Sequence, residues 1–347
     1  MGDRDLKMED LGEFGFIRSI QDACLVSASK LIKGIGDDCA VIGPYEDRVF
    51  LITSDLLLED VHFILNKISP EHLGEKAISV NLSDIAAMGG TPRHLFVSLA
   101  IPKHMRAETM LAVYNGIKTA CRRHDVNILG GDTSASLDRL MINVTVVGES
   151  HEKEVLYRSG AQPGDSIYIT GTIGDSAAGL KLIKEDASAP EPLASALIEA
   201  HNRPSPFLKA GRTVARSRLA SAMIDLSDGL ASDLWHICEA SNVGARLIQS
   251  ALPLSDELKK MAEINGLDPY ILALSGGEDY RLLITVPKKN IDRFQKMIEE
   301  SDKCPIFHVG DITGDNGIGI ILPNGMKDQL DVTGFDHFIP SHFFPKK

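Results

Sequence analysis

The spacing of apolar residues along the chain predicts both helices and strands. From residue 14 apolar side chains recur at every third or fourth position, which predicts an amphipathic helix over 14–30. The continuous apolar run 49–57 predicts a strand that is buried on both faces. Ser69 followed by Pro70 is typical of the first turn of a helix, which we expect to continue to about Met88 before two glycines end it.

The same periodicities predict further elements of both kinds. In the first part of the chain they are strands at 39–42, 95–101, near 128 and at 140–147, and a helix at 107–123. In the second part they are strands at 166–170, 222–226, 245–249, 280–286, 307–309 and 318–322, and helices at 176–184, 192–200, 206–216 and 291–299. Ser227 or Asp228 is expected to cap a further helix that runs through Ala240.

The order of these elements indicates the fold class and a division into domains. Because strand-to-strand and strand-to-helix connections are mixed, we expect an α+β fold and not a doubly wound parallel sheet. The length of 347 residues is enough for two domains. The charged stretch 149–155 (ESHEKEV) is typical of a linker, so we expect domains at 1–150 and 151–347.

The charge of the chain limits the ligands that it can bind. A formal charge of −12 argues against nucleic acid or an anionic membrane as a partner. It also makes a polyphosphate ligand unfavourable unless metal ions accompany it. The N-terminus has neither the basic start nor the apolar core of a signal peptide, and no apolar run is long enough to span a bilayer. We therefore expect a cytoplasmic protein, and its scattered cysteines indicate neither a zinc site nor a disulfide framework.

Six acidic turns are the strongest chemical signal in the chain. Each places a carboxylate after small, flexible residues, and a convergent set of carboxylates needs a cation to offset its repulsion. Mg²⁺ takes oxygen ligands and keeps positions for water and substrate phosphate, so we expect a magnesium–phosphate site. The turns are GIGDD (34–38), TSD (53–55), NLSD (81–84), GGD (130–132), DLSDG (225–229) and SGGED (275–279).

The common alternatives to such a site are absent from the sequence. There is no P-loop motif, and the glycine pair at 34 and 36 lacks the third glycine of a dinucleotide fingerprint. The DLSDG turn has Asp225 where a nucleophile elbow requires glycine. No H-E-x-x-H pair is present, and His62 taken alone is more typical of a solvated or capping histidine than of a metal ligand. Metal-assisted phosphate chemistry built from carboxylates remains.

Taken together, the motifs resemble the thiamine-monophosphate kinase family, which is grouped with aminoimidazole ribonucleotide synthetase and selenophosphate synthetase. The resemblance covers nearly the whole chain in order. It implies two mixed α/β domains of the synthetase type with an ATP site between them, a homodimer, several Mg²⁺ ions and direct phosphoryl transfer from ATP to thiamine phosphate. The motifs that carry it are GEFGFI (12–17), GIGDDCAVI (34–42), TSDLLLEDVHF (53–63), KAISVNLSDIAAMGGTP (76–92), NILGGDTS (127–134), YRSGAQPGD (157–165), IDLSDGL (224–230), LSGGEDY (274–280) and TGFDHF (333–338).

The resemblance also implies a role for individual residues. Those implied to hold Mg²⁺ are Asp38, Thr53, Ser54, Asp55, Asp84, Asp132, Asp225 and Asp228. Those implied to contact ATP are Tyr114, Gly131, Asp132, Arg158 and Ser227. Those implied to face thiamine phosphate are His62, Glu278 and Phe335, and no residue is required as a general base.

Several alternatives stay open at this point. Asp84 is equally compatible with a solvated helix face, Asp228 with a helix cap, Arg158 with a surface charge and Tyr114 with a core aromatic. Phe335 stands where the family usually has Trp, which weakens an aromatic contact with the cationic thiazolium ring, and it is also compatible with anchoring the C-terminal tail. The alternative functions are another ATP-dependent synthetase of the group, or a non-catalytic protein that binds Mg²⁺ or a nucleotide.

Overall fold

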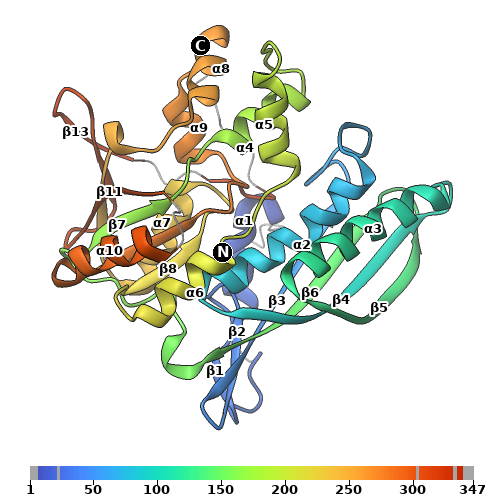
Figure 1. The fold of residues 1–347 in the computed structure, drawn as a ribbon, viewed down its shortest axis with the longest axis horizontal. Helices are drawn as coiled ribbons and strands as arrows, with labels where there is room; N and C mark the ends of the chain where they lie inside the picture. Colours follow the sequence, from blue (N-terminus) through green and yellow to red (C-terminus); the bar gives the residue numbers. More distant parts are fainter. Residues whose placement is uncertain (1–6, 22–23, 302–304, 331–333, 339–347) are drawn as a thin grey trace, which may run out of the picture.

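The computed structural model describes residues 7–21, 24–301, 305–330 and 334–338. Within them the chain forms two β-sheets with helices packed against them (Figure 1). The first sheet has six strands in the order β1-β2-β3-β6-β4-β5, and its neighbours are antiparallel except for the parallel pair β4 and β5. Its strands are β1 (Leu31–Lys33), β2 (Ala40–Tyr45), β3 (Arg48–Leu58), β4 (Thr91–Pro102), β5 (Asn127–Ser136) and β6 (Met141–His151).

The second sheet has seven strands in the order β13-β12-β9-β11-β7-β10-β8. Only the pair β12 and β9 is parallel among the described strands of this sheet. With helices packed against both mixed sheets, the structure has the α+β class that the sequence predicts. The strands are β7 (Ser166–Thr170), β8 (Ala222–Asp225), β9 (Gly244–Ile248), β10 (Leu282–Val286), β11 (Ile306–Thr313), β12 (Ile318–Ile321) and β13 (Lys327–Gln329).

Helices cover one face of the first sheet and surround the second. The helices are α1 (Met8–Ile20), α2 (Pro70–Ala87), α3 (Ala107–His124), α4 (Asp175–Ile183), α5 (Leu193–Asn202), α6 (Leu208–Ser217), α7 (Leu230–Ser241), α8 (Asp256–Asn265), α9 (Pro269–Ser275) and α10 (Ile291–Ser301). Figure 1 shows α2 and α3 side by side on the first sheet. The C-terminal end of α2 also packs against α6 and β8, so α2 touches both halves of the chain.

The sequence predicts α2 correctly because its signals are local. The hydroxyl of Ser69 accepts a hydrogen bond from the backbone N–H of His72 at 3.1 Å, and Pro70 occupies the first turn. Close packing against α3 then depends on Gly74 and Gly116. A Cβ at Gly74 would lie 2.0 Å from a backbone oxygen of α3, and one at Gly116 would lie 1.9 Å from the carbonyl oxygen of Glu71. Glycine at these two positions allows the helices to approach.

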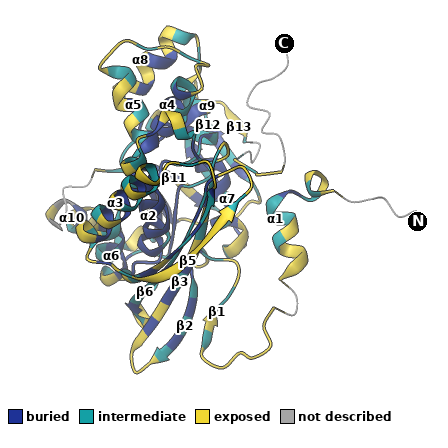
Figure 2. Cartoon of the chain, turned by 90° about the vertical axis from the view of Figure 1, so that its right-hand side faces the viewer, coloured by how far each residue is buried: buried dark blue, intermediate teal, exposed yellow. Residues whose placement is uncertain are grey.

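The prediction that β3 is buried on both faces is wrong. Burial alternates along the strand: Leu51 and Leu57 lie in the core, whereas Phe50 and Leu56 are 42% and 43% exposed. Figure 2 shows the edge strand β5 of the same sheet exposed along most of its length. The helices cover only one face, and an apolar run in the sequence does not report whether a second face is covered.

Other boundaries differ from the sequence prediction. The first helix is Met8–Ile20, earlier than predicted, and the stretch predicted as a linker is ordered: β6 continues to His151 and a short 3-10 helix follows at Glu152–Glu154. The helices α8 and α9 were not predicted. No helix in the described part of the chain has the length and apolarity needed to cross a bilayer.

Candidate active site

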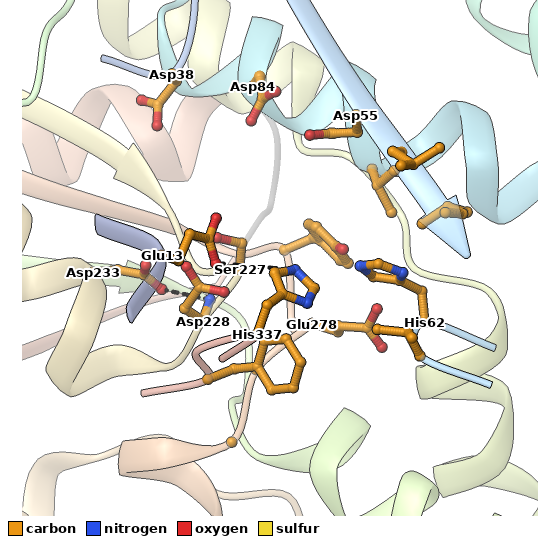
Figure 3. A pocket seen from close by; sticks show the side chains of 18 of the residues that line it. Glu13, Asp38, Asp55, His62, Asp84, Ser227, Asp228, Asp233, Glu278 and His337 are labelled. Atoms are coloured by element: carbon orange, nitrogen blue, oxygen red, sulfur yellow. Dashed lines mark hydrogen bonds and ion pairs between the residues drawn. The ribbon is translucent and has the colours of Figure 1, made fainter. Parts of the chain in front are cut away.

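A cavity of about 1170 Å³ lies between the two halves of the chain. Its walls come from α1, β3, α2, α4, α5 and α7 and from loops of both halves (Figure 3). Most of the residues that the sequence singles out meet here. Those that line the cavity are Asp38, Thr53, Ser54, Asp55, His62, Asp84, Arg158, Ser227, Asp228, Glu278 and Phe335.

Three carboxylates form a compact cluster at one wall of the cavity. Asp38 precedes β2, Asp84 lies in the last turn of α2 and Asp225 is the last residue of β8. Each offers an oxygen atom, and these atoms all lie within 4.8 Å of one another. The hydroxyl of Thr53 donates to Asp84, and the hydroxyl of Ser83 donates to Asp225. Both halves of the chain therefore contribute to one acidic cluster.

Without a bound cation, burial and mutual repulsion make the ionised forms of these three carboxylates unfavourable. Burial and then the neighbouring carboxylates raise the pKa of Asp84 well above its usual range. Burial raises the pKa of Asp38 to about 7, although Arg158 opposes this shift by donating to Asp38 Oδ1 at 2.6 and 3.0 Å. Burial also raises the pKa of Asp225 to about 6. Among the described residues, the buried Oδ2 of Asp38 has no hydrogen-bond partner, so it is free to bind a metal ion.

Two further carboxylates extend the acidic wall. Burial raises the pKa of Asp55 on β3 to about 6, and burial followed by repulsion from Glu13 raises that of Asp228 to about 7. Figure 3 shows Asp38, Asp84 and Asp55 along one side of the cavity and Asp228 with Glu13 facing them. Among the described residues, Asp38 is paired with Arg158, and the other carboxylates face a shared space.

The turn that carries Asp228 is held differently from the sequence prediction. Neither Ser227 nor Asp228 caps the next helix, because α7 begins at Leu230 with Gly229 as its N-cap. The capping acceptor is instead Asp233, whose Oδ2 accepts the backbone N–H groups of Asp228 and Gly229 at 3.2 and 3.1 Å. The carboxylate of Asp228 consequently remains available to the cavity.

The other end of the cavity collects aromatic and polar side chains. The backbone N–H of Leu58 donates to Nδ1 of His62 at 3.0 Å, so the neutral ring carries its proton on Nε2. The ring of His62 lies 5.0 Å from that of His337, which in turn lies 4.8 Å from the ring of Phe335. Glu278 closes this end, as Figure 3 shows.

Four of the predicted residues do not line this cavity: Asp225 reaches the acidic cluster from β8, and the other three lie elsewhere. Tyr114 on α3 is half-buried and packs against the first core, as a core aromatic would. Gly131 and Asp132 lie exposed on β5, the edge strand. Two strands separate β5 from β3, so Asp132 is about 14 Å from the position of Asp55 at about 4.8 Å per strand. Within one chain, these residues therefore do not complete the acidic cluster.

The motifs of the sequence did not reveal several residues of the site. Glu13 and His337 come from the motifs GEFGFI and TGFDHF, which were noted without a role for these two side chains. The backbone N–H of Glu13 donates to Asp336 at 3.0 Å, so α1 and the segment 334–338 meet beside the cavity. Lys76 and His201 were also missed. For Lys76 there was a signal in the sequence, because a lysine within the apolar pattern of a helix is unusual.

Comparison with known proteins agrees with this geometry. The AIR synthase related protein N-terminal domain matches residues 36–150, and the C-terminal domain of the same family matches residues 162–323. The chain is 39% identical to a thiamine-monophosphate kinase of Aquifex aeolicus over 85% of this chain and 92% of that protein. It is 35% identical to the thiamine-monophosphate kinase of Bacillus subtilis over 94% of this chain and the whole of that protein.

A solved structure gives the same result in three dimensions. The structure of AaThiL complexed with AMPPCP and TMP matches with a TM-score of 0.83 at 36% identity, and covers 96% of this chain and 99% of that one. The fold is thus shared along nearly the whole of this chain. The chain belongs to the AIR synthase related family and, within it, to the thiamine-monophosphate kinases.

Proposed function

We propose that this protein transfers the γ-phosphoryl group of ATP to thiamine phosphate, giving thiamine diphosphate and ADP. The observation that carries the proposal is the match along nearly the whole chain to kinases of this name and to a complex with AMPPCP and TMP. The cavity supports it because the acidic cluster and the His62–Glu278 end lie in one continuous space. That space can hold a nucleotide and a second phosphorylated ligand together.

We further propose that the carboxylates bind Mg²⁺. Asp38, Asp84 and Asp225 offer oxygens within 4.8 Å of one another, and this donor set suits a hard cation. Thr53, Ser54, Asp55 and Asp228 line the same space, which supports more than one ion. When bound, Mg²⁺ neutralises charge on the transferring phosphoryl group and aligns its oxygens.

The chain's own residues then bind and orient the reactants. The acceptor phosphate has a second pKa near 6, so it is mostly dianionic at pH 7 and needs no general base. Arg158 supplies a guanidinium at the acidic wall, where it also holds Asp38 in place. At the opposite end, His62 presents its Nε2 proton, and Phe335 offers a ring face on which a cationic ring can stack.

We also propose that the chain works as a homodimer. The strand β4 has no free edge for a partner, because it is hydrogen-bonded to β5 on one side and to β6 on the other. The open edge belongs to β5. The face of this sheet opposite α2 exposes Phe50, Leu56, Phe96 and Leu129, and β5 carries Asp132 and Gly131 away from its own cavity. A second copy on this face would cover the apolar side chains and bring Asp132 to its neighbour's site.

The activity is tested by incubating the protein with ATP, Mg²⁺ and thiamine phosphate and separating the products by chromatography. Equal amounts of thiamine diphosphate and ADP are expected. ADP with free phosphate and no diphosphate would indicate a synthetase of the same group. No turnover would indicate a nucleotide-binding protein without catalysis.

The dimer is tested by mixing two inactive variants, Asp84→Asn and Asp132→Asn. If Asp132 serves the partner's site, a mixed dimer contains one intact site, and an equimolar mixture recovers about a quarter of the wild-type activity after subunit exchange. If Asp132 serves its own chain, both sites of the mixed dimer stay defective and no activity returns. Light scattering after gel filtration gives the oligomeric state independently.

A further inference from the structure

Lys76 is a completely buried lysine beside the cavity. Its side chain on α2 is 0% exposed, and its Nζ lies 3.0 Å from Glu278 Oε2 and 3.3 Å from the backbone oxygen of His62. Burying an ammonium group is costly unless it is paired and hydrogen-bonded. Here the two partners are residues that line the substrate end of the cavity. Lys76 therefore joins these two residues from behind the cavity wall.

His201 contacts the same carboxylate from a different helix. Its Nδ1 on α5 lies 3.2 Å from Glu278 Oε2 and 3.0 Å from the hydroxyl of Ser176. Burial, followed by the charge of Lys76, lowers the pKa of His201 to about 4, so its ring is neutral near pH 7. Burial alone would raise the pKa of Glu278, but the charge of Lys76 and the hydrogen bond that it donates oppose burial, and the pKa is lowered. Glu278 is thus an ionised carboxylate.

The contacts on Glu278 leave one of its oxygens available. Both Lys76 and His201 contact Oε2, while no contact of Oε1 is found among the described residues. The backbone of Glu278 has φ of 64°, which is uncommon for a residue with a side chain, and its N–H donates to the carbonyl oxygen of Ser227 at 2.7 Å. The carboxylate of Glu278 is therefore held in its position by a strained backbone conformation.

We propose that Lys76 and His201 are positioning residues that fix Glu278 by Oε2 and present Oε1 to an N–H donor of the substrate. Because the charge of Glu278 is already paired with Lys76, its remaining capacity is that of a hydrogen-bond acceptor. Thiamine phosphate carries its N–H donor in the amino group of its pyrimidine ring. The inference rests on the proposed function, and it assigns that amino group to Glu278 Oε1.

The first test replaces Lys76 by methionine, which has a similar length and no charge. We expect the Michaelis constant for thiamine phosphate to rise at least tenfold, while kcat and the constant for ATP change by less than about threefold. In a Glu278→Gln background, the same substitution should add less than about a twofold effect, because Lys76 acts through Glu278. Ile78→Val, a small change in the buried face of the same helix, is the packing control and should leave all constants unchanged.

The second test uses oxythiamine phosphate, in which an oxo group replaces the amino group. The wild-type protein should prefer thiamine phosphate by at least about a hundredfold in kcat/KM, since the analogue presents an oxo acceptor where Glu278 requires the amino donor. Lys76→Met should lose most of this preference. A purely structural role of Lys76 would lower activity towards both compounds equally, and an unchanged preference in a folded variant would overturn the proposal.

Two measurements keep the proposal testable. If Lys76→Met does not fold, as judged by circular dichroism, His201→Leu removes the second contact to Oε2 and should reduce the same preference. Calorimetric binding of thiamine phosphate and oxythiamine phosphate requires no turnover. A wild-type protein that binds both compounds equally refutes the inference, whereas one that discriminates between them but forms no thiamine diphosphate refutes only the proposed function.

Discussion

Replacing Asp84 by asparagine should stabilise the metal-free protein while it removes activity. Asp84 lies in the last turn of α2, and its carboxylate faces those of Asp38 and Asp225. Asparagine keeps the size of the side chain, and its carbonyl oxygen can still accept from the hydroxyl of Thr53. The substitution therefore removes a charge and leaves the packing in place.

The size of the effect follows from the geometry. Two unit charges 4.8 Å apart repel by about 3.5 kcal/mol at an effective dielectric constant of 20. The raised pKa values of Asp38 and Asp225 mean that the cluster is only partly ionised at pH 7, so we expect a gain of about 1–2 kcal/mol. For a chain of this size, this gain corresponds to a rise in melting temperature of about 2–5 °C.

The assay combines thermal unfolding with steady-state kinetics. In the presence of EDTA, Asp84→Asn should melt above the wild-type protein, and Mg²⁺ should raise its melting temperature by less than it raises that of the wild type. Turnover should fall at least tenfold, which corresponds to about 1.4 kcal/mol in the barrier. Asp328→Asn, at an exposed position on β13, is the matched control and should change none of these values.

The opposite outcome would refute the reasoning. If Asp84→Asn melts below the wild-type protein without metal, the cluster contributes hydrogen bonds that outweigh its repulsion. If Mg²⁺ stabilises the variant as strongly as the wild type, Asp84 is not a ligand. Either result would remove the argument that burial and mutual repulsion of the acids favour metal binding.

Three further predictions follow from the same structure. Burial raises the pKa of Asp38 and Asp228 to about 7. The stability that these two groups contribute to the folded state is therefore fully present below about pH 4 and is lost as the pH rises through 7. Because the ionised carboxylates then repel one another, Mg²⁺ should raise the melting temperature more at pH 8 than at pH 5. Phe335→Trp should lower the Michaelis constant for thiamine phosphate with little change in kcat and Phe335→Ala should raise it, whereas an earlier melting point with unchanged constants would make Phe335 a structural anchor only. Gly116→Ala should destabilise the protein by about 1–3 kcal/mol in denaturant unfolding, because its Cβ would lie 1.9 Å from the carbonyl oxygen of Glu71; an unchanged midpoint would contradict the close approach of α2 and α3.

Elements with strong local signals could be predicted from the sequence. The strand Ser166–Thr170 and the start of α2 at Pro70 were predicted at the correct residues, because the apolar pattern and the Ser69 cap act within a few positions. The helix Asp256–Asn265 had comparable signals in Ser255 and Gly266, and these were overlooked. The exposed face of β3 could not be predicted, because it depends on which elements cover the sheet.

The sequence predicts those site residues that belong to its motifs. It does not predict the residues whose role depends on contacts made only in the folded chain. The acids at 38, 84 and 225 stand out in the sequence because each follows small residues, and the structure brings them together, although Asp84 lies in α2 and not in a turn. Asp233 gave no such signal, because its role depends on the backbone of the turn that it holds. No pattern in the sequence marks His201 either, since only the fold brings α5 next to Glu278.

The helix α2 explains why the two ends of the cavity keep a fixed separation. Lys76, Val80 and Asp84 follow one another at intervals of four residues; Val80 and Asp84 line the cavity, and Lys76 holds Glu278 behind its wall. At 1.5 Å per residue, the first and last lie about 12 Å apart along the helix axis. The position of the acidic cluster relative to Glu278 is thereby set by one rigid element that packs against both halves of the chain. Because each residue turns the helix by about 100°, inserting one residue between Lys76 and Asp84 would move one of them off this face, and so would uncouple substrate binding from the acids.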